Sequence, residues 1–562
     1  MAPGKLWRNR PQAGPLFLSV FLLFTVVLAG CGNRGNGSTT VHHKNSVTVV
    51  ANQAGDLVKN FNPFSGNVIS GTQGLIYETL LFFNRVDSSV HSWLAESYEF
   101  SPDATTVTFH LHPNITWSDG QPFSSADVKF TLDLLVKYPD LDLNGITPFI
   151  KSVSTPDAST VVVVLTQPDS PLLWYLGGQT YIVPQHKWST IKGDPGQYSD
   201  ENPVGTGPFT MGTFTPQLLT LDKNSHYWQA GKPAVQQVKF PAFSSNTSSE
   251  LVLNNDGIDW NGQYTPDIEK TYVKRDPQHH FYWFPPSDVV LLYLNLAKYP
   301  FNQLPVRQAI SNAINRDRIS SVAESGYEPV TSPTGLVLPA SQKFLDPQYA
   351  SAKFSVNSAN ANTLLTGAGF TRGADGIYAD KNGKKLSFSI IVPEGWTDWI
   401  TTCQFMSNDL KAIGMDVSVD TVDYDAFYND LQLGQFDSAL WGTNAGPSPY
   451  FIYDSLLRST NGAPLGKQAG SNFERWNDPE TDKLLNQYAT STDQNIQTQA
   501  IYGLQKIMVE QLPSIPLMNE PYWYEFNTLY WVGWPDAAHP YAEPAPYSYP
   551  DNEMVLLNLR PS

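Results

Sequence analysis

Short apolar runs of strand length alternate with capped helical segments along this chain, and that alternation restricts it to a mixed α/β fold. Residues 47–50 and 161–165 have the length and β-branched content of buried strands. Residues 124–127 carry the S-x-x-D pattern that begins helices. Residues 381–384, Lys-Asn-Gly-Lys between two strand-like runs, predict a type I′ hairpin. No short repeat is detectable.

Two further helices are predicted from apolar spacing. Pro305 occupies the tolerated first turn of one, and apolar residues follow it at helical intervals. The other carries a stripe with spacings of 4, 3, 4 and 3 residues, formed by Trp399, Cys403, Met406, Leu410 and Ile413. Cys403 is therefore predicted to be a core residue and not a nucleophile.

Composition excludes several classes of protein. At 562 residues, the chain exceeds what one compact core holds, so we expect more than one domain. A mean hydropathy of -0.28 excludes a polytopic membrane protein. The formal charge of -17 argues against nucleic acid as a partner, because such binding needs a basic surface. Aromatic residues make up 13% of the chain, enough to fill cores and also to line a ligand cleft.

The first 30 residues have the features of a secretory signal. Lys5, Arg8 and Arg10 form a positive start, and residues 16–29 are an apolar run too short for a permanent membrane span. The run ends in Leu-Ala-Gly followed by Cys31, which resembles the bacterial lipobox. We expect cleavage of residues 1–30 and a lipid on Cys31, so that the protein is extracytoplasmic and touches the membrane through this anchor only. The alternative is an ordinary secretory signal with an incidental cysteine.

The segment after Cys31 is small and polar, so residues 31–45 are predicted to be a flexible tether, with the folded body beginning near Val47. Without residues 1–30 the charge becomes -20. Cys403 is the one other cysteine in the sequence, so a lipidated Cys31 leaves no intrachain disulfide.

Motifs of catalysis and of cofactor binding are missing from the sequence. The turn at residues 205–207, Gly-Thr-Gly, lacks the lysine of a phosphate-binding loop. The histidine pairs at residues 42–43 and 279–280 lack the spacing of zinc ligands. No G-x-S-x-G motif occurs. We expect no enzymatic activity, no cofactor and no metal.

Six segments together resemble one family, the extracytoplasmic solute-binding proteins of ABC importers in the oligopeptide, dipeptide and nickel class, often called family 5. They follow the family order across nearly the whole mature chain. The segments are residues 117–128, 202–209, 306–316, 364–370, 410–415 and 436–442.

The resemblance implies a periplasmic-binding-protein type II-like α/β fold, with two lobes in three domains and the ligand cleft between them. Carried onto this chain, domain I is discontinuous and takes residues 46–75, 204–284 and 520–562. Domain II is 76–203, and domain III is 285–519. The implied function is capture of a small solute by lobe closure and its delivery to ABC permease subunits, by a protein that we expect to be a monomer.

The resemblance also indicates ligand-binding positions. Peptide-binding members carry an aspartate, in the loop after residues 436–437, that pairs with the ligand's α-amino group. In this chain Gly446 stands at that position, and Asp454 or Asp437 could substitute. A buried ammonium without a carboxylate partner would be costly, so recognition of a peptide amino terminus needs another partner here. The same loop supplies Asn444, Ser448 and Tyr450 as ligand-binding candidates.

Aromatic residues complete the predicted site. Tyr424 matches a position where relatives place an aromatic against the ligand, and a core tyrosine is the equal alternative. Trp396 and Trp441 are candidates for ligand stacking, while Trp399 lies on the apolar stripe and is predicted to be core. The missing aspartate and clustered tryptophans keep a cello- or xylo-type oligosaccharide open beside the oligopeptide, which we place first. A surface-anchored hydrolase is the third hypothesis.

Overall fold

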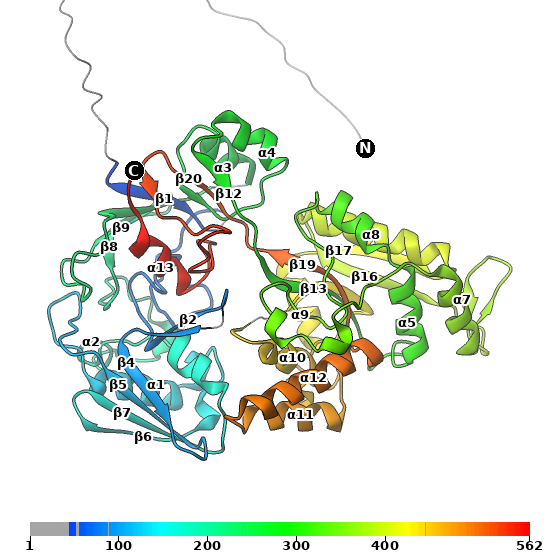
Figure 1. Cartoon of the computed structure of the whole chain (residues 1–562), viewed down its shortest axis with the longest axis horizontal. Coiled ribbons are helices and arrows are strands. Elements are labelled where there is room, and N and C mark those ends of the chain that lie inside the picture. The colour runs from blue at the N-terminus through cyan, green and yellow to red at the C-terminus, as the bar shows by residue number, and fades with distance from the viewer. Residues whose placement is uncertain (1–43, 52–54, 88, 244–245, 444–445) are drawn as a thin grey trace, which may run out of the picture. The chain divides into compact units, whose positions relative to one another are not determined.

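Strand β1 (Ser46–Val50) is the centre of the first sheet, where it pairs in parallel with β10 and with β11. The buried side chains of Val47 and Val49 confirm the predicted first strand. The seven strands stand in the order β12-β20-β11-β1-β10-β9-β8. Figure 1 labels five of them, β12, β20, β1, β9 and β8. The other six are β8 (Phe209–Thr215), β9 (Leu218–Lys223), β10 (Gln237–Pro241), β11 (Trp260–Asn261), β12 (His280–Tyr282) and β20 (Glu525–Asn527).

The structure is a computed structural model. It describes residues 44–51, 55–87, 89–243, 246–443 and 446–562, without the side chains of residues 246, 424 and 425. Along these residues, no helix combines the length and the apolar character that crossing a bilayer requires.

A second sheet has five strands in the order β17-β16-β18-β13-β19. These strands are β13 (Pro286–Leu294), β16 (Ser387–Pro393), β17 (Asp416–Val422), β18 (Ser438–Gly442) and β19 (Ile515–Pro521). Three helices pack with it around one core, namely α5 (Leu304–Ala313), α7 (Ser358–Gly367) and α8 (Thr397–Ala412). The predicted stripe on α8 is confirmed, because Trp399, Cys403, Met406 and Leu410 are all buried in this core.

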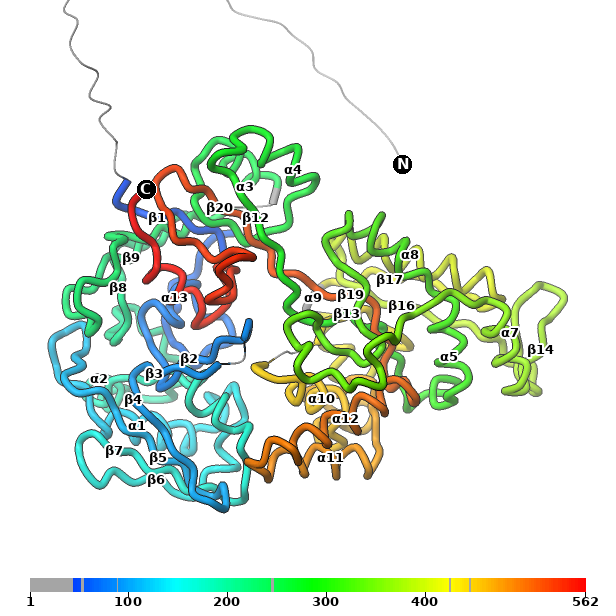
Figure 2. Tube along the Cα trace, viewed as in Figure 1, coloured from blue at the N-terminus to red at the C-terminus, as the bar shows by residue number. Residues whose placement is uncertain are grey.

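The chain crosses between these two sheets twice, and the crossings lie side by side. Residues 283–285 lead from β12 to β13, and residues 522–524 lead from β19 back to β20. The two crossings are hydrogen-bonded, since the Trp283 amide donates to the Tyr524 carbonyl (3.1 Å) and the Tyr522 amide donates to the Pro285 carbonyl (2.9 Å). Figure 2 shows the two traces running together.

A third sheet, in the order β4-β5-β7-β6, packs against helix α1 (Ser125–Lys137). Its strands are β4 (Ala95–Phe100), β5 (Thr106–Leu111), β6 (Ile150–Asp157) and β7 (Thr160–Leu165). Ser124 and Asp127 form the predicted capping box of α1. The predicted strand at 161–165 is present but buried on one face only, because alternate residues of β7 are partly exposed.

The remaining helices are α2 (Gln185–Trp188), α3 (Asn246–Leu253), α4 (Ile268–Thr271), α6 (Arg316–Arg318), α9 (Tyr424–Leu433), α10 (Pro449–Leu457), α11 (Pro479–Ala489), α12 (Gln494–Gln511) and α13 (Asp551–Asn558). Three two-stranded pairs complete the fold. They are β2 (Leu81–Asn84) with β3 (Ser89–Ser92), β14 (Thr371–Arg372) with β15 (Tyr378–Ala379), and β21 (Trp531–Val532) with β22 (Arg560–Pro561).

The hairpin predicted around residues 381–384 is present, since Ala379 and Lys385 form an antiparallel bridge and the Leu386 amide donates to the Tyr378 carbonyl (2.8 Å), but the predicted type I′ turn is wrong. That turn needs positive φ at both central residues, and of the two only Gly383 has it, at 79°. The Asp380 carboxylate instead accepts hydrogen bonds from the amides of Asn382 (2.8 Å) and Lys384 (2.9 Å). This side-chain contact closes a wider loop.

The turn at Gly205 and Gly207 has a packing role. A Cβ at Gly205 would lie 1.8 Å from the Ile76 carbonyl oxygen, and one at Gly207 would lie 2.5 Å from the Leu75 carbonyl oxygen. The Gly207 amide donates to the Ile76 carbonyl (2.9 Å). Glycine is required here because one backbone lies directly against another. The three-domain division with the boundaries given above stays a prediction.

Candidate functional site

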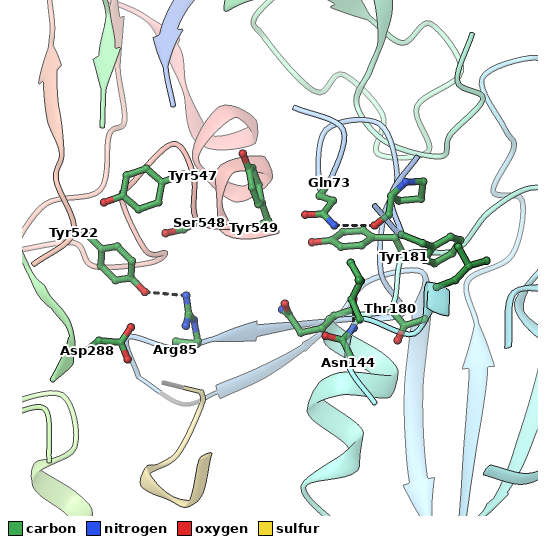
Figure 3. A pocket seen from close by; sticks show the side chains of 15 residues that line it. Gln73, Arg85, Asn144, Thr180, Tyr181, Asp288, Tyr522, Tyr547, Ser548 and Tyr549 are labelled. Atoms are coloured by element: carbon green, nitrogen blue, oxygen red, sulfur yellow. Dashed lines mark hydrogen bonds between the residues drawn. The ribbon is translucent and has the colours of Figure 1, made fainter. Parts of the chain in front are cut away.

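Three adjoining cavities share one residue, Arg85. Their volumes are about 380, 500 and 820 Å³, and Arg85 lines all three. These volumes fall in the range typical of sites for small-molecule ligands. Their walls come from segments far apart in the sequence, including the β2–β3 turn, both crossings, the start of α10 and the segment before α13. Figure 3 shows the cavity of about 380 Å³.

Arg85 is placed by contacts with the C-terminal part of the chain. It follows β2, and its guanidinium forms an ion pair with Glu543 and donates a hydrogen bond to the Tyr522 hydroxyl (2.8 Å). Burial alone would lower the pKa of Arg85, but the charge of Glu543 and weaker contributions from Tyr522 raise it above its usual value. Arg85 is therefore a fixed cation at the junction of the cavities.

Amide and phenol groups dominate the 380 Å³ cavity. Gln73, Asn144 and Gln179 contribute side-chain amides, and the phenols come from a short C-terminal segment, the second crossing and the segment before α2 (Figure 3). The phenols belong to Tyr181, Tyr522, Tyr547 and Tyr549. Asp288 of β13 is the carboxylate on this wall. Such groups donate and accept hydrogen bonds, so the cavity suits a polar solute with many hydrogen-bonding atoms.

The wall of the 820 Å³ cavity carries an ion pair, Arg458 with Asp454, beside the predicted ligand-binding residue Tyr450. Tyr450 lines it, and its hydroxyl accepts a hydrogen bond from Arg458 (3.0 Å), which also pairs with Asp454. Burial, with the charge of Asp454 adding to it, raises the pKa of Asp169 on the same wall to about 6. Asp454 is thus already paired within the chain.

Gly446 and Ser448 line the 500 Å³ cavity, whose wall is largely apolar and includes Trp283 and Phe284. Gly446 packs tightly, because a Cβ there would lie 2.5 Å from the Phe451 ring. An aspartate therefore does not fit at this position in the present packing.

The tryptophan candidates form a separate aromatic group. The rings of Trp396 and Trp441 stack with centroids 5.9 Å apart, and Trp399 meets Trp396 edge-on at 4.9 Å. Trp399 is 5% exposed, which confirms its prediction as core, whereas Trp396 is 37% exposed. Neither Trp396 nor Trp441 lines any of the three cavities. Their role in ligand binding stays a prediction.

Three predicted positions lie beyond what the structure describes. Asn444 and Cys31 lie outside the described residues, and the side chain of Tyr424 is among those not described. Of the seven predicted ligand-binding residues, the structure brings Gly446 and Ser448 together at one cavity, Tyr450 at another, and Trp396 with Trp441 in a stack.

The sequence predictions missed Arg85, Asp288 and the tyrosines of the 380 Å³ cavity. Arg85 meets its partners more than 430 residues away along the chain, so no local pattern marks it. Two of these tyrosines, Tyr547 and Tyr549, did carry a signal, because they lie in a segment rich in tyrosine and proline, residues 541–550. Such a segment has little helix or strand propensity and places rings along an irregular surface.

The two sheets and their paired crossings define the architecture of the type II periplasmic binding proteins, and the solved structures agree. A periplasmic oligopeptide-binding protein of an oligopeptide ABC transporter from Thermotoga maritima superposes with a TM-score of 0.87 at 24% identity, covering 93% of this chain and all of that one. A mannohexaose-bound structure carrying the same protein description superposes with a TM-score of 0.80. At this identity the likeness shows the fold alone.

The chain belongs to the bacterial extracellular solute-binding proteins, family 5, whose model matches residues 89–464. It is 26% identical to the nickel-binding periplasmic protein of Escherichia coli over 76% of this chain and 80% of that protein. It is 24% identical to the peptide transport periplasmic protein SapA of Salmonella typhimurium, over 84% of this chain and 87% of that protein. It is thus a solute-binding protein of the class that serves ABC importers.

Proposed function

We propose that this protein captures an oligopeptide-class solute outside the cytoplasm and delivers it to the permease of an ABC importer. The set of three cavities that meet at Arg85 carries this proposal, because together they offer an elongated solute several adjoining compartments. The hydrogen-bonding amides and phenols of the smallest cavity suit peptide backbone, whose N–H and C=O groups repeat along the ligand. Closure about the two crossings is the proposed mechanism, without bond chemistry.

An oligosaccharide is the second candidate. The partly exposed ring of Trp396, which stacks on the ring of Trp441, favours this ligand class. Sugar rings stack their C–H faces on indoles while their hydroxyls bond to amides. The mannohexaose-bound structure with the same fold adds support.

A thermal-shift screen of the full mature chain against tetra-alanine and mannohexaose separates the two candidates. A bound ligand at 100 times its Kd stabilises the protein by about 2.7 kcal/mol. We expect tetra-alanine to raise the melting temperature of the protein. We also expect mass spectrometry to show that the recovered tetra-alanine is chemically unchanged. Stabilisation by mannohexaose alone would contradict the peptide assignment, and time-dependent cleavage of either ligand would identify the hydrolase instead.

Attachment through a lipid on Cys31 is part of the proposal. The charged start, the apolar run and the Leu-Ala-Gly-Cys sequence support it. In a bacterial host, we expect the wild-type protein to partition into the detergent phase and the Cys31→Ala variant into the aqueous phase. Equal partitioning of both would contradict the anchor. Size-exclusion chromatography with light scattering tests the proposed monomer.

A further inference from the structure

The 500 Å³ cavity differs from its two neighbours in the chemistry of its wall. Most of the residues that line it are apolar, and prolines recur among them. A proline has no N–H group and its ring fixes φ, so these stretches present a stiff surface that donates no hydrogen bond. We call this space the proline-lined cavity. The prolines are Pro285, Pro286, Pro339, Pro449, Pro540 and Pro544.

Five polar side chains of this wall already have partners within the chain. Arg85 pairs with Glu543 and donates to the Tyr522 hydroxyl. The Ser287 hydroxyl donates to a backbone carbonyl of β19 (3.0 Å), and the Ser448 hydroxyl shares a hydrogen bond with a tyrosine hydroxyl of α11 (3.1 Å). A group that enters the cavity therefore need not supply hydrogen bonds to these side chains, and a polar group would lose water without full replacement.

Trp283 gives an independent sign that an apolar group binds here. It belongs to the first crossing, is partly exposed and lines the cavity. Within the described residues, its indole ring has no aromatic partner and its side chain makes no hydrogen bond. The next residue, Phe284, by contrast packs edge-on against Tyr327 (5.4 Å) and Trp523 (5.0 Å). The indole of Trp283 is thus available as a surface on which a ring of the solute can stack.

The proline-lined cavity has room for such a ring. Its volume is about 500 Å³. An apolar cavity of about 150 Å³ already accommodates benzene. Water in a space with few unpaired polar groups is poorly held, and its displacement by an apolar group increases affinity. A solute therefore gains by placing an apolar group in this cavity.

The cavity is continuous with the polar part of the site. Arg85 and Tyr522 line both the proline-lined cavity and the 380 Å³ cavity. A solute that bonds to the amides and phenols of the 380 Å³ cavity can therefore extend a side group past these two residues into the apolar space. The two cavities together match a polar chain that carries an apolar side group.

We propose that the proline-lined cavity binds a large apolar side group of the solute, with an aromatic ring as the best fit. For a peptide, this group is the side chain at one position along the chain. The stiff wall is preformed, so little binding energy is lost in ordering it. The inference rests on the proposed capture of a solute and adds a chemical requirement by which the protein selects among solutes of that class.

Isothermal titration of the full mature chain with tetra-alanine and its substituted forms tests this requirement. In one set of four peptides, phenylalanine replaces each alanine in turn, and in a second set glutamine does so. We expect phenylalanine at one position to increase the affinity at least about tenfold over tetra-alanine, because its side chain leaves water. Glutamine, a polar side chain, is expected to give no gain at that position.

A matched pair of variants connects the preference to this cavity. Ala340 and Ala538 are both exposed, but Ala340 lines the proline-lined cavity and Ala538 lines none of the three. Ala340→Trp is expected to fill the space and reduce the phenylalanine preference to within about twofold of none, whereas Ala538→Trp keeps it. A preference that survives Ala340→Trp overturns the proposal.

A neutral aromatic dye, N-phenyl-1-naphthylamine, gives a readout that needs no peptide. Such dyes fluoresce when they bind apolar surface. We expect the wild type and Ala538→Trp to bind the dye with equal affinity and Ala340→Trp to bind it at least about tenfold more weakly. The phenylalanine peptide that binds most tightly is expected to displace the dye from the wild type. Failure of that peptide to displace the dye contradicts a shared cavity.

The outcomes separate this inference from the proposed function. Tetrapeptide binding without a phenylalanine preference at any position overturns the inference and leaves the peptide proposal standing. Dye binding that Ala340→Trp weakens, without binding of any tetrapeptide, supports the apolar cavity and overturns the peptide proposal. Binding of neither the dye nor a tetrapeptide counts against both.

Discussion

Two tryptophans three positions apart on one segment have opposite environments. Trp399 is 5% exposed and packs with Cys403 and Met406 in the core of the second sheet, while Trp396 is 37% exposed and stacks on Trp441. Residue spacing on α8 predicts this difference, because an apolar stripe marks the face that meets the sheet. Arg85 shows the limit of such arguments, since contacts with Tyr522 and Glu543 position it and neither lies near it in sequence.

The pair yields a prediction about stability and binding. Trp399→Ala removes a buried ring and is expected to lower the free energy of unfolding by about 3–5 kcal/mol. Trp396→Ala opens no core cavity, so it is expected to leave the unliganded melting temperature nearly unchanged and to weaken solute binding. Urea unfolding and calorimetric titration of both variants measure this. Equal destabilisation by the two substitutions would place Trp396 in the core.

The helices that the sequence predicts correctly are those whose signals lie within a few residues along the chain, such as a cap or an apolar stripe. The capped start of α1, the proline in the first turn of α5 and the stripe of α8 all appear as expected. The hairpin around residues 381–384 forms, but not with the type I′ turn, because the Asp380 carboxylate accepts hydrogen bonds from the turn amides, a contact that dipeptide propensity does not include. The paired crossings depend on the pairing of β13 with β19, whose residues are more than 200 positions apart in the sequence. A local sequence pattern therefore cannot predict them.

The contact between Gly205 and Ile76 gives a prediction at this scale. Gly205→Ala would place a Cβ against a carbonyl oxygen that is held by its own backbone, so we expect a loss of about 3 kcal/mol or more in the free energy of unfolding. Gly66→Ala is the control, since nothing lies within 4 Å of its Cβ position. Denaturant titration compares the two, and near-equal midpoints would refute the packing role.

Over the whole molecule, acidic groups set the pH response. Burial raises the folded-state pKa of Glu324, Glu474, Glu520 and Glu525 to about 8 each; neighbouring carboxylates add to the rise at Glu324 and Glu520, whereas hydrogen bonds oppose it at Glu474 and Glu525. The folded state then binds more protons than the unfolded state between the ordinary glutamate pKa and about 8. Their contribution to stability is therefore complete below the unfolded pKa and is lost as pH rises through the folded pKa.

The corresponding measurement is the melting temperature of the unliganded protein from acid to mildly alkaline pH. We expect Glu525→Gln, which stays neutral throughout, to show a smaller decline with rising pH than the wild type. The difference between the two curves isolates this carboxyl group from all the others. A wild-type curve that declines no more steeply than that of the variant would contradict the assignment.

At the scale of the whole molecule, the central proposal is solute capture by closure about the two crossings. Small-angle X-ray scattering of the mature chain, with and without a saturating amount of the probe that binds, tests it most directly. We predict that the radius of gyration falls on saturation and returns to its initial value when the ligand, chemically unchanged, is removed by dialysis. An identical radius of gyration at demonstrated saturation would contradict capture by closure.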